Sequence, residues 1–195
     1  MLLRTPDSLL REALCPALAT ERLVLRKPTL GDTAAITHLV NDWRVAENLR
    51  RVPHPYAETD AEDFIAHVET GRDLIFLVTL ANDPIGMIGL DLAHPERPEL
   101  GYWFGVDHWG QGFATEAVRA VIDLAFEDLD VSHLYSAARV TNPASRHVLE
   151  KCGFQWTGVE LHRFLALGSS TPVDCFCLDR RVWSSLKTWV NAARG

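Results

Sequence analysis

The sequence predicts a mixed α/β (α+β) domain, built on a mostly antiparallel sheet of six to seven strands with helices on both faces. Three apolar segments follow one another with short connections, which is typical of an antiparallel meander. After them the chain runs strand, glycine-bearing loop, helix and strand, which is typical of a parallel crossover. A chain of 195 residues, 47% of them hydrophobic, is long enough to bury a core of its own.

The N-terminal part of the domain begins with a strand. Residues 20–27 alternate leucine with charged side chains, which is the period of two of a half-buried strand. A helix follows with Asp32 as its N-cap, and residues 41–58 are irregular because prolines interrupt them. Thr59 caps the next helix, over 60–70, since acidic residues gather in its first turn.

The remaining elements follow from periodicity and from turn residues. Asn142 before Pro143 is a strong helix start, and Gly153 is a good residue to end that helix. Ala114, Ala117, Val118, Val121, Leu124 and Ala125 form one apolar helix face. The expected strands are 74–80, 85–92, 99–106, 133–140, 155–166 and 172–178, and the expected helices are 113–128, Pro143 to Gly153 and about 180–192.

Composition limits the partners and the compartment. The formal net charge of -7 disfavours a broad nucleic-acid surface and suits a cationic substrate better. No apolar run approaches the length of a membrane span, and there is no signal-peptide core, so we expect a cytoplasmic protein with no membrane or nucleic-acid partner. None of the cysteines has the spacing of a zinc or redox pair, and we expect reduced, mostly buried thiols at Cys15, Cys152, Cys175 and Cys177.

The segment GVDHWGQGFAT, from Gly105 to Thr115, carries the strongest chemical signal. Its glycines allow a backbone to approach a ligand closely, and the first amides of the following helix have no internal partners. Such a helix N-terminus binds a phosphate or pyrophosphate. A tight strand-to-helix turn without a ligand is the alternative. A dinucleotide fold is disfavoured, because the loop follows a third antiparallel strand and no carboxylate ends the next strand.

The string ELGYWFGVDHWGQGFATEA, followed by NPASRHVLEKCGF, resembles the GNAT superfamily of acetyl-CoA-dependent N-acyltransferases, and its RimJ/RimL-like branch most closely. TERLVLRKPTLGD and IGMIGL are similar to that branch as well. The resemblance covers about 19–180, which leaves 1–18 as an N-terminal extension and 181–195 as a C-terminal helix. It implies the GNAT fold, acetyl-CoA as co-substrate without a metal, an amine acceptor, and a monomer or homodimer.

The resemblance also implies a coenzyme site. The family's pyrophosphate motif falls on Trp109, Gly112 and Ala114, where Trp109 replaces a side chain that would donate to phosphate. The implied cofactor-binding residues are Phe104, Val106, Trp109, Gly110, Gln111, Gly112, Phe113, Ala114, Thr115, Asn142 and Ser145. Within this set the backbone from Phe104 to Val106 pairs with the pantetheine arm. A helix N-cap role explains Asn142 equally well, and Ser145 has a backbone contact as its alternative.

Glu99 is the candidate general base, acting directly or through water, because it matches a catalytic glutamate of some superfamily members. An ion pair with an arginine is its alternative role. Leu149 stands where many members carry a general-acid tyrosine, so Ser145 or water is the expected proton donor. A backbone N–H near Phe104 or Val106 would hold the oxyanion.

The acceptor is left open among a protein N-terminus, a polyamine, an aminoglycoside and another small amine. We expect residues 43–58 and the hairpin after Phe164 to bind it, with Trp103 and Trp156 as possible walls. Asp42, Glu47 and Glu58 could attract a cation or form a solvated face. The eight histidines show no metal-ligand spacing, although His108 could contact a phosphate. A non-catalytic acyl-CoA-binding sensor or interaction module is the second hypothesis for the whole protein.

Overall fold

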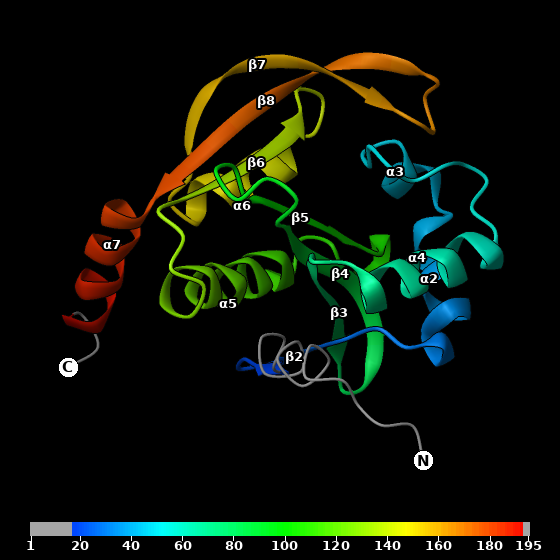
Figure 1. The fold of residues 1–195 in the computed structure, drawn as a ribbon, viewed down its shortest axis with the longest axis horizontal. Helices are drawn as coiled ribbons and strands as arrows, with labels where there is room; N and C mark the ends of the chain where they lie inside the picture. The colour runs from blue at the N-terminus through cyan, green and yellow to red at the C-terminus, as the bar shows by residue number, and fades with distance from the viewer. Residues whose placement is uncertain (1–16, 193–195) are drawn as a thin grey trace.

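The computed structural model describes residues 17–192, and these form one eight-stranded sheet in the order β1-β2-β3-β4-β5-β6-β8-β7 (Figure 1). All neighbours are antiparallel except β5 and β6, which are parallel, as the meander and crossover predict. The eighth strand is the two-residue β1, which sequence patterns did not show. The strands are β1 Leu18–Ala19, β2 Leu23–Arg26, β3 Leu74–Leu80, β4 Asp83–Asp91, β5 Glu99–Phe104, β6 His133–Arg139, β7 Gln155–Phe164 and β8 Ser169–Asp179.

Helices cover both faces of the sheet. Helices α2 and α4 pack on one face and α5 packs on the other (Figure 1). The helices are η1 Leu30–Asp32, α2 Thr33–Val40, α3 Trp43–Ala46, α4 Glu58–Thr70, η2 Val106–His108, α5 Phe113–Glu127, α6 Pro143–Lys151 and α7 Arg180–Ala192. None of the helices in this described range has the length and hydropathy needed to cross a membrane.

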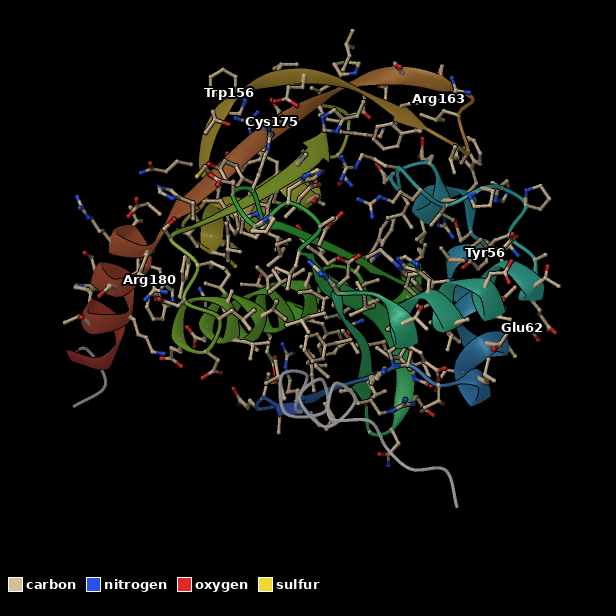
Figure 2. All side chains as sticks on the ribbon, in the orientation of Figure 1. Tyr56, Glu62, Trp156, Arg163, Cys175 and Arg180 are labelled. Carbon is tan, nitrogen blue, oxygen red and sulfur yellow. The ribbon has the colours of Figure 1, made fainter. Side chains whose placement is uncertain are left out.

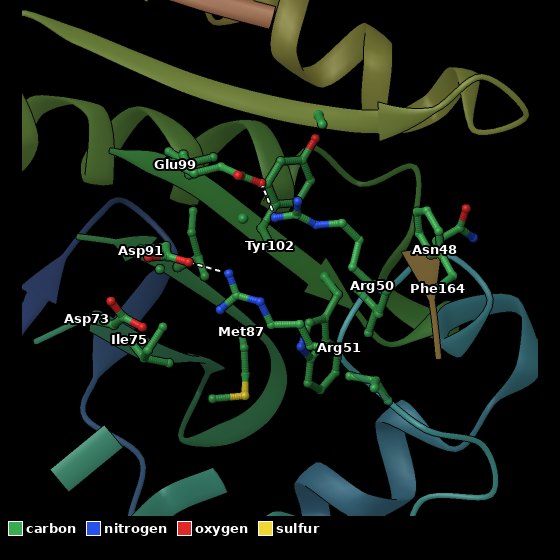
Figure 3. A pocket seen from close by; sticks show the side chains of 18 of the residues that line it. Asn48, Arg50, Arg51, Asp73, Ile75, Met87, Asp91, Glu99, Tyr102 and Phe164 are labelled. Atoms are coloured by element: carbon green, nitrogen blue, oxygen red, sulfur yellow. Dashed lines mark hydrogen bonds and ion pairs between the residues drawn. The ribbon is translucent and has the colours of Figure 1, made fainter. Parts of the chain in front are cut away.

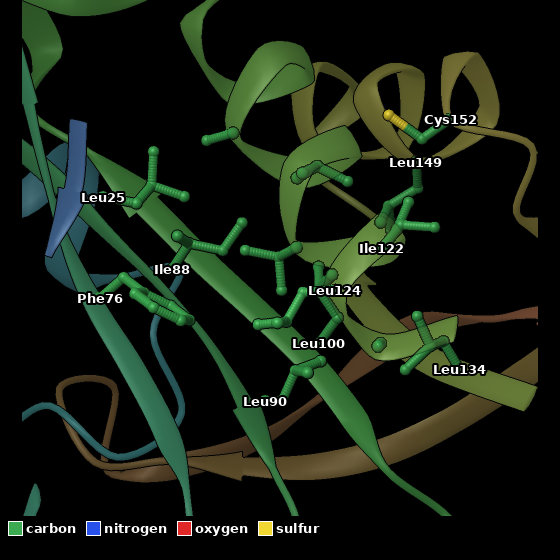
Figure 4. Packing of buried hydrophobic residues seen from close by; sticks show 14 of the residues in the cluster. Leu25, Phe76, Ile88, Leu90, Leu100, Ile122, Leu124, Leu134, Leu149 and Cys152 are labelled. Carbon is green, nitrogen blue, oxygen red and sulfur yellow. The ribbon is translucent and has the colours of Figure 1, made fainter. Parts of the chain in front are cut away.

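The main core lies between α5 and the central strands (Figure 4). Ala117, Val118, Val121 and Ala125 of α5 are fully buried against apolar residues of β2 to β6, which confirms the predicted apolar face. A second cluster joins α2, α3 and α4 to the opposite face of β3 and β4. The two clusters hold the central strands from both sides and thereby fix the strand ends that form the site.

Three local expectations were wrong and a fourth holds in part. Asp32 is the N-cap of α2, as expected, but its side chain does not cap the helix, because its carboxylate accepts from the Thr29 N–H (2.8 Å) and pairs with Arg26 (2.7 Å). Helix α4 begins at Glu58, before Thr59, because the Asp60 carboxylate accepts from the Ala57 N–H (2.8 Å). The segment expected to be irregular, 41–58, contains the one-turn helix α3. The strand expected over 99–106 ends at residue 104, since the chain turns into η2.

The cysteines agree with the expectation of reduced thiols. Cys152 and Cys175 are buried and free, and Cys177 is free and half-buried. Cys175 lies on β8 opposite the β7 segment that carries Trp156 (Figure 2). Burial raises the pKa of the Cys152 thiol to about 11, which keeps it protonated and unreactive at neutral pH. Cys15 lies outside the described residues.

Candidate active site

The site begins where β5 and β6 diverge. The two parallel strands are paired only at Glu99 and Tyr135, and beyond this point the Ser136 hydroxyl donates to the Leu100 carbonyl (2.8 Å) in place of a backbone partner. A cavity of about 420 Å³ occupies the gap and is lined by β5, the loop after it, α5, β6 and α6. A missing neighbour on a strand edge can be replaced by an extended ligand that carries amides.

The loop at the end of this cavity has the conformation that its glycines suggest. Gly110 and Gly112 have φ of +73° and +83°, which side-chain-bearing residues rarely adopt, and Gly112 is the N-cap of α5. The N–H groups of Phe113, Ala114 and Thr115 form the first turn and have no intrahelical partners. These three residues line the cavity together with Gly110 and Gly112. The arrangement provides unpaired amides and the positive end of a 15-residue helix at one wall.

Trp109 has a structural role at this loop. Its indole Nε1 donates to the Phe104 carbonyl (2.7 Å), so its single donor is used within the chain. Phe104 is the last residue of β5, and the neighbouring Gly105 N–H donates to Ile85 of β4 (2.9 Å). The backbone groups of an antiparallel strand point alternately to its two neighbours, so those of Phe104 point away from β4, into the gap between β5 and β6. Because Trp109 occupies the Phe104 carbonyl, the Phe104 N–H is the group left for a ligand. Val106 lies past the strand, in η2, and does not line the cavity.

Arg22, which directly precedes β2, holds the glycine-bearing loop and the start of α5 in place. Its guanidinium donates to the Gln111 carbonyl (3.0 Å) and to Glu116 of α5 (2.7 Å), and it lies over the Phe113 ring at 4.5 Å. Burial opposes the charge of Glu116, but hydrogen bonds from Thr20 and Arg22 hold its pKa below the usual range. Gln111 does not line the cavity, and its side chain donates back to the Asp107 carbonyl (2.8 Å).

Asn142 and Ser145 lie at the start of α6, on the other side of the gap. The Asn142 side chain accepts from the Ser145 N–H (3.1 Å), so the N-cap role is present, and both residues also line the cavity. The Ser145 Oγ lies 2.9 Å from the Tyr102 hydroxyl, which also reaches the Ser145 carbonyl (3.0 Å). Burial raises the pKa of Tyr102 above its usual range, so the phenol keeps its proton and its hydroxyl is a hydrogen-bond donor.

A second cavity of about 250 Å³ opens on the opposite face of β5 (Figure 3). Glu99 lies in it and forms an ion pair with Arg50, and beside this pair Arg51 forms an ion pair with Asp91 of β4. Arg51 itself has a raised pKa because of its hydrogen bond to Asp91. The arginine contact that the sequence left as the alternative for Glu99 is therefore present.

The two cavities adjoin, but the two catalytic candidates lie in different ones. Glu99 lines only the smaller cavity and Ser145 only the larger. Side chains alternate along β5, so Glu99 and Tyr102 leave it on opposite faces. The cavities share Asn48, Leu49, Gly101, Tyr102, Trp103, Ala137 and Arg139. A ligand passing between β5 and β6 would meet Ser145 and Tyr102 on one side and Glu99 on the other.

The segments expected to bind the acceptor do meet at the smaller cavity. Residues 48–52 line it together with Phe164, and the Leu165 N–H donates to the Arg50 carbonyl (3.1 Å). Trp103 lines both cavities, whereas Trp156 is exposed and donates to Asp174 (2.9 Å). His108 lines the larger cavity. Among the expected attracting carboxylates, Asp42 pairs with Arg44, Glu47 pairs with Arg139, and Glu58 is exposed and lines neither cavity.

A group of potential metal ligands lies next to the smaller cavity. The ligand atoms of Glu160, His162 and Cys175 are all within 4.8 Å of one another. Arg50 donates to His162 Nδ1 (3.1 Å), so this nitrogen is an acceptor and Nε2–H donates to Glu160 (2.9 Å). Hydrogen bonds from His162 and Arg97 lower the pKa of Glu160. The guanidinium groups of Arg50 and Arg97 at this cluster oppose a bound cation.

Sequence reasoning missed three residues of the site. Tyr102 lies inside the ELGYW motif, but its contact with Ser145 joins residues 43 positions apart. Arg50 and Arg51 lie in the segment expected to be irregular, which has no periodicity to orient them. The pair of adjacent arginines was the available signal, but only the fold shows that each faces a carboxylate of a central strand.

The fold and the two adjoining cavities are those of an acyltransferase with separate openings for two substrates. Residues 22–155 match the model of the acetyltransferase (GNAT) domain. YoaA of Bacillus subtilis, an uncharacterized N-acetyltransferase, is 31% identical over 168 residues, which cover 82% of this chain and 93% of that protein. The ribosomal-protein-serine acetyltransferase of Escherichia coli is 28% identical over 88 residues, 44% of this chain and 49% of the relative.

A solved structure has a similar fold. RimJ of Mycobacterium smegmatis, in complex with a CoA-disulfide, superposes with a TM-score of 0.70 at 20% identity, over 80% of this chain and 81% of that one. The chain therefore belongs to the GNAT family of acetyltransferases, and it is an acetyl-CoA-dependent N-acetyltransferase. The family match lies within the range 19–180 expected from the motifs.

Proposed function

We propose that the protein transfers an acetyl group from acetyl-CoA to a primary amine by direct attack while both are bound. The observation that supports this best is the pair of adjoining cavities, one ending at unpaired helix amides and the other containing Glu99. Two openings that meet at Gly101 and Trp103 suit two substrates that react at their meeting point.

The larger cavity fits the coenzyme. Amides from Phe113 to Thr115 would hold the diphosphate, with Gly110 leaving room for it, since a Cβ there would meet nothing within 4 Å. The Phe104 N–H would pair with the pantetheine arm or hold the oxyanion. Trp109 would act indirectly by occupying the Phe104 carbonyl. The CoA-containing structure of RimJ supports a coenzyme in this fold.

The acceptor must lose a proton before or as it attacks. An α-amine with a pKa of about 8 is roughly 10% neutral at pH 7, whereas a lysine at about 10.4 is under 0.1% neutral. Glu99 would receive the amine proton, directly or through water. Its ion pair with Arg50 would fix its position in the cavity, and Arg50 is itself held by His162 of β7 (3.1 Å).

The leaving thiolate needs a proton. As the amine nitrogen bonds to the carbonyl carbon, the carbon–sulfur bond breaks, and Ser145 Oγ would donate a proton to the sulfur. Tyr102 would position that hydroxyl, since the two oxygens are 2.9 Å apart, and water in the cavity would replace the proton that Ser145 gives up. Leu149, where a general-acid tyrosine might stand, is fully buried in the core and has no role at the site.

The test is a thiol-release assay with a panel of amines, with the acetylated product identified by mass spectrometry. Transfer to at least one amine, with loss of at least tenfold in kcat for Glu99→Gln, is expected. If the protein is instead a non-catalytic sensor, it should bind CoA and transfer an acetyl group to no amine. The smaller cavity would then have no function. That outcome would overturn the proposal.

A further inference from the structure

The smaller cavity carries balanced charge. Its lining includes three cations, Arg50, Arg51 and Arg139, and three anions, Asp73, Asp91 and Glu99, so the formal sum is zero. An acceptor with several positive charges gains nothing from such a lining, because long-range attraction follows the net charge.

The carboxylates form a row across the sheet. Asp91 of β4 and Glu99 of β5 are direct cross-strand partners, so their side chains lie on the same face. Asp73, one residue before β3, lies beside Asp91, and its carboxylate accepts from the Leu92 N–H (3.0 Å). Like charges directly opposite each other repel, and the two arginines offset this repulsion.

The arginines reach the row from the opposite wall. Arg50 pairs with Glu99 and Arg51 with Asp91, which places two ion pairs side by side over the cavity (Figure 3). The Arg51 side chain is 69% exposed and its partner Asp91 only 23%, so the guanidinium presents free donors to anything that enters. Guanidinium donors bind carboxylates and phosphates in a fixed fork.

Around the cavity the other carboxylates are also paired. Glu47 is held by Arg139 and Glu160 by Arg97. A polyamine or an aminoglycoside could reach Asp73 freely, but it would have to displace an arginine at both Glu99 and Asp91. A ligand with one amine and one anionic group can instead insert into an existing ion pair. Its ammonium group then meets the carboxylate and its anionic group meets the arginine, so no charge is left unpaired.

We infer that the preferred acceptor is a primary amine that carries an anionic group of its own, such as a free α-amino acid or an acidic peptide N-terminus. This inference rests on the proposed function and names its substrate class. The ammonium group lies against the carboxylates of Glu99 and Asp91, and the anionic group binds Arg51. A cavity of about 250 Å³ has room for one residue, below the range of roughly 300–1,000 Å³ for drug-sized ligands.

The experiment compares matched acceptors with the full-length protein. Each of the twenty L-amino acids is assayed against its α-amide, beside spermidine, ribostamycin and tripeptides that begin Ser-Asp or Ser-Lys. At least one acid-bearing amine is expected to exceed its uncharged or cationic counterpart by tenfold or more in kcat/KM. A preference for a free amino acid would indicate a small-molecule acceptor, and a preference for the Ser-Asp peptide would indicate an acidic peptide N-terminus.

Variants then locate the preference. Arg51→Gln is expected to lower kcat/KM for the acid by about tenfold or more and for its amide by less than twofold, and Arg51→Lys is expected to restore part of the difference. Arg146→Gln is the matched control, because it removes a half-exposed arginine from an i,i+4 ion pair and Arg146 lines neither cavity. Equal losses for acid and amide in Arg51→Gln would overturn the inference.

A binding measurement separates this inference from the proposed function. Calorimetry with free CoA present tests whether the acid binds more tightly than its amide without any reaction. Tighter binding without transfer in the assay would support the inference and overturn the catalytic proposal. Transfer that favours spermidine, ribostamycin or the amides would overturn the inference and leave the catalytic proposal standing.

Discussion

Ala114→Asp is the sharpest test of the phosphate-binding loop. Ala114 is the second residue of α5 and lines the larger cavity, so a carboxylate there projects toward the expected diphosphate. An acidic residue in the first turn of a helix stabilises that helix by roughly 0.3–1 kcal/mol, so the fold should tolerate it. Ala114→Asn has nearly the same shape without the charge and is the matched control.

The size of the effect follows from Coulomb's law. At a separation of about 7 Å and an effective dielectric constant of about 40, each pair of unit charges costs roughly 1.2 kcal/mol, and two phosphate charges cost roughly 2.4 kcal/mol. Since 1.4 kcal/mol is a tenfold change, the Kd for CoA should rise by about 50-fold. The penalty should shrink as salt rises, because the cavity is open to solvent.

Calorimetric titration with CoA at low and at high salt measures this directly, with thermal unfolding as the check on folding. A Kd for Ala114→Asp within about threefold of the unchanged protein at low salt would show that the diphosphate lies elsewhere. An equal loss for Ala114→Asn would mean that bulk is responsible. Gly112→Asp is a weaker test, because a Cβ at Gly112 lies 3.4 Å from an Arg22 guanidinium nitrogen and the new carboxylate would pair with it.

Four further outcomes are expected. Glu99→Gln should abolish the fall in kcat/KM at low pH that protonation of a general base produces; an unchanged pH–rate profile would exclude Glu99 as the base. Ser145→Ala should lower kcat by about 10²-fold or more and leave CoA affinity nearly unchanged. Asp32 has a pKa of about 2, chiefly through its hydrogen bond from Arg26, so its stabilisation is complete above about pH 4 and lost as pH falls toward 2. Asp32→Asn should cost roughly 1–2 kcal/mol in urea unfolding at pH 7 and little near pH 2. Gly89→Ala should lower stability by about 1–3 kcal/mol, because its Cβ would lie 2.7 Å from the backbone carbonyl oxygen of Leu74, which cannot move aside as a side chain could.

The fold was predictable where a pattern repeats or a residue has few alternatives. Strand 74–80 was placed at its true ends, and α5 and α6 nearly so, because periodicity and the pair Asn142-Pro143 leave little freedom. The conformation of the glycine-bearing loop was predictable as well, since Gly110 and Gly112 both adopt a positive φ that favours glycine. The errors fall where a carboxylate had two possible partners, as when Asp32 binds Thr29 and Arg26 instead of capping α2.

The acceptor side was much less predictable, because its contacts join distant segments. Arg50 and Glu99 are 49 positions apart, and Arg51 and Asp91 are 40 positions apart. No local pattern in the sequence pairs them. Without the pairing, the carboxylates of the chain suggest attraction for a cation. With it, Glu99 and Asp91 are each neutralised by an arginine.

This difference bears on how the acceptor of a GNAT enzyme is inferred. The proposed coenzyme site uses backbone amides of Phe113 to Thr115, which depend on the fold more than on the side chains. The proposed acceptor site uses side chains, so its charge depends on the residues of the particular chain. Here Asp91 and Glu99 would bind an ammonium group only in exchange for an arginine, and the arginine released needs an anion. An acceptor that brings both charges satisfies every group, which a polycation does not.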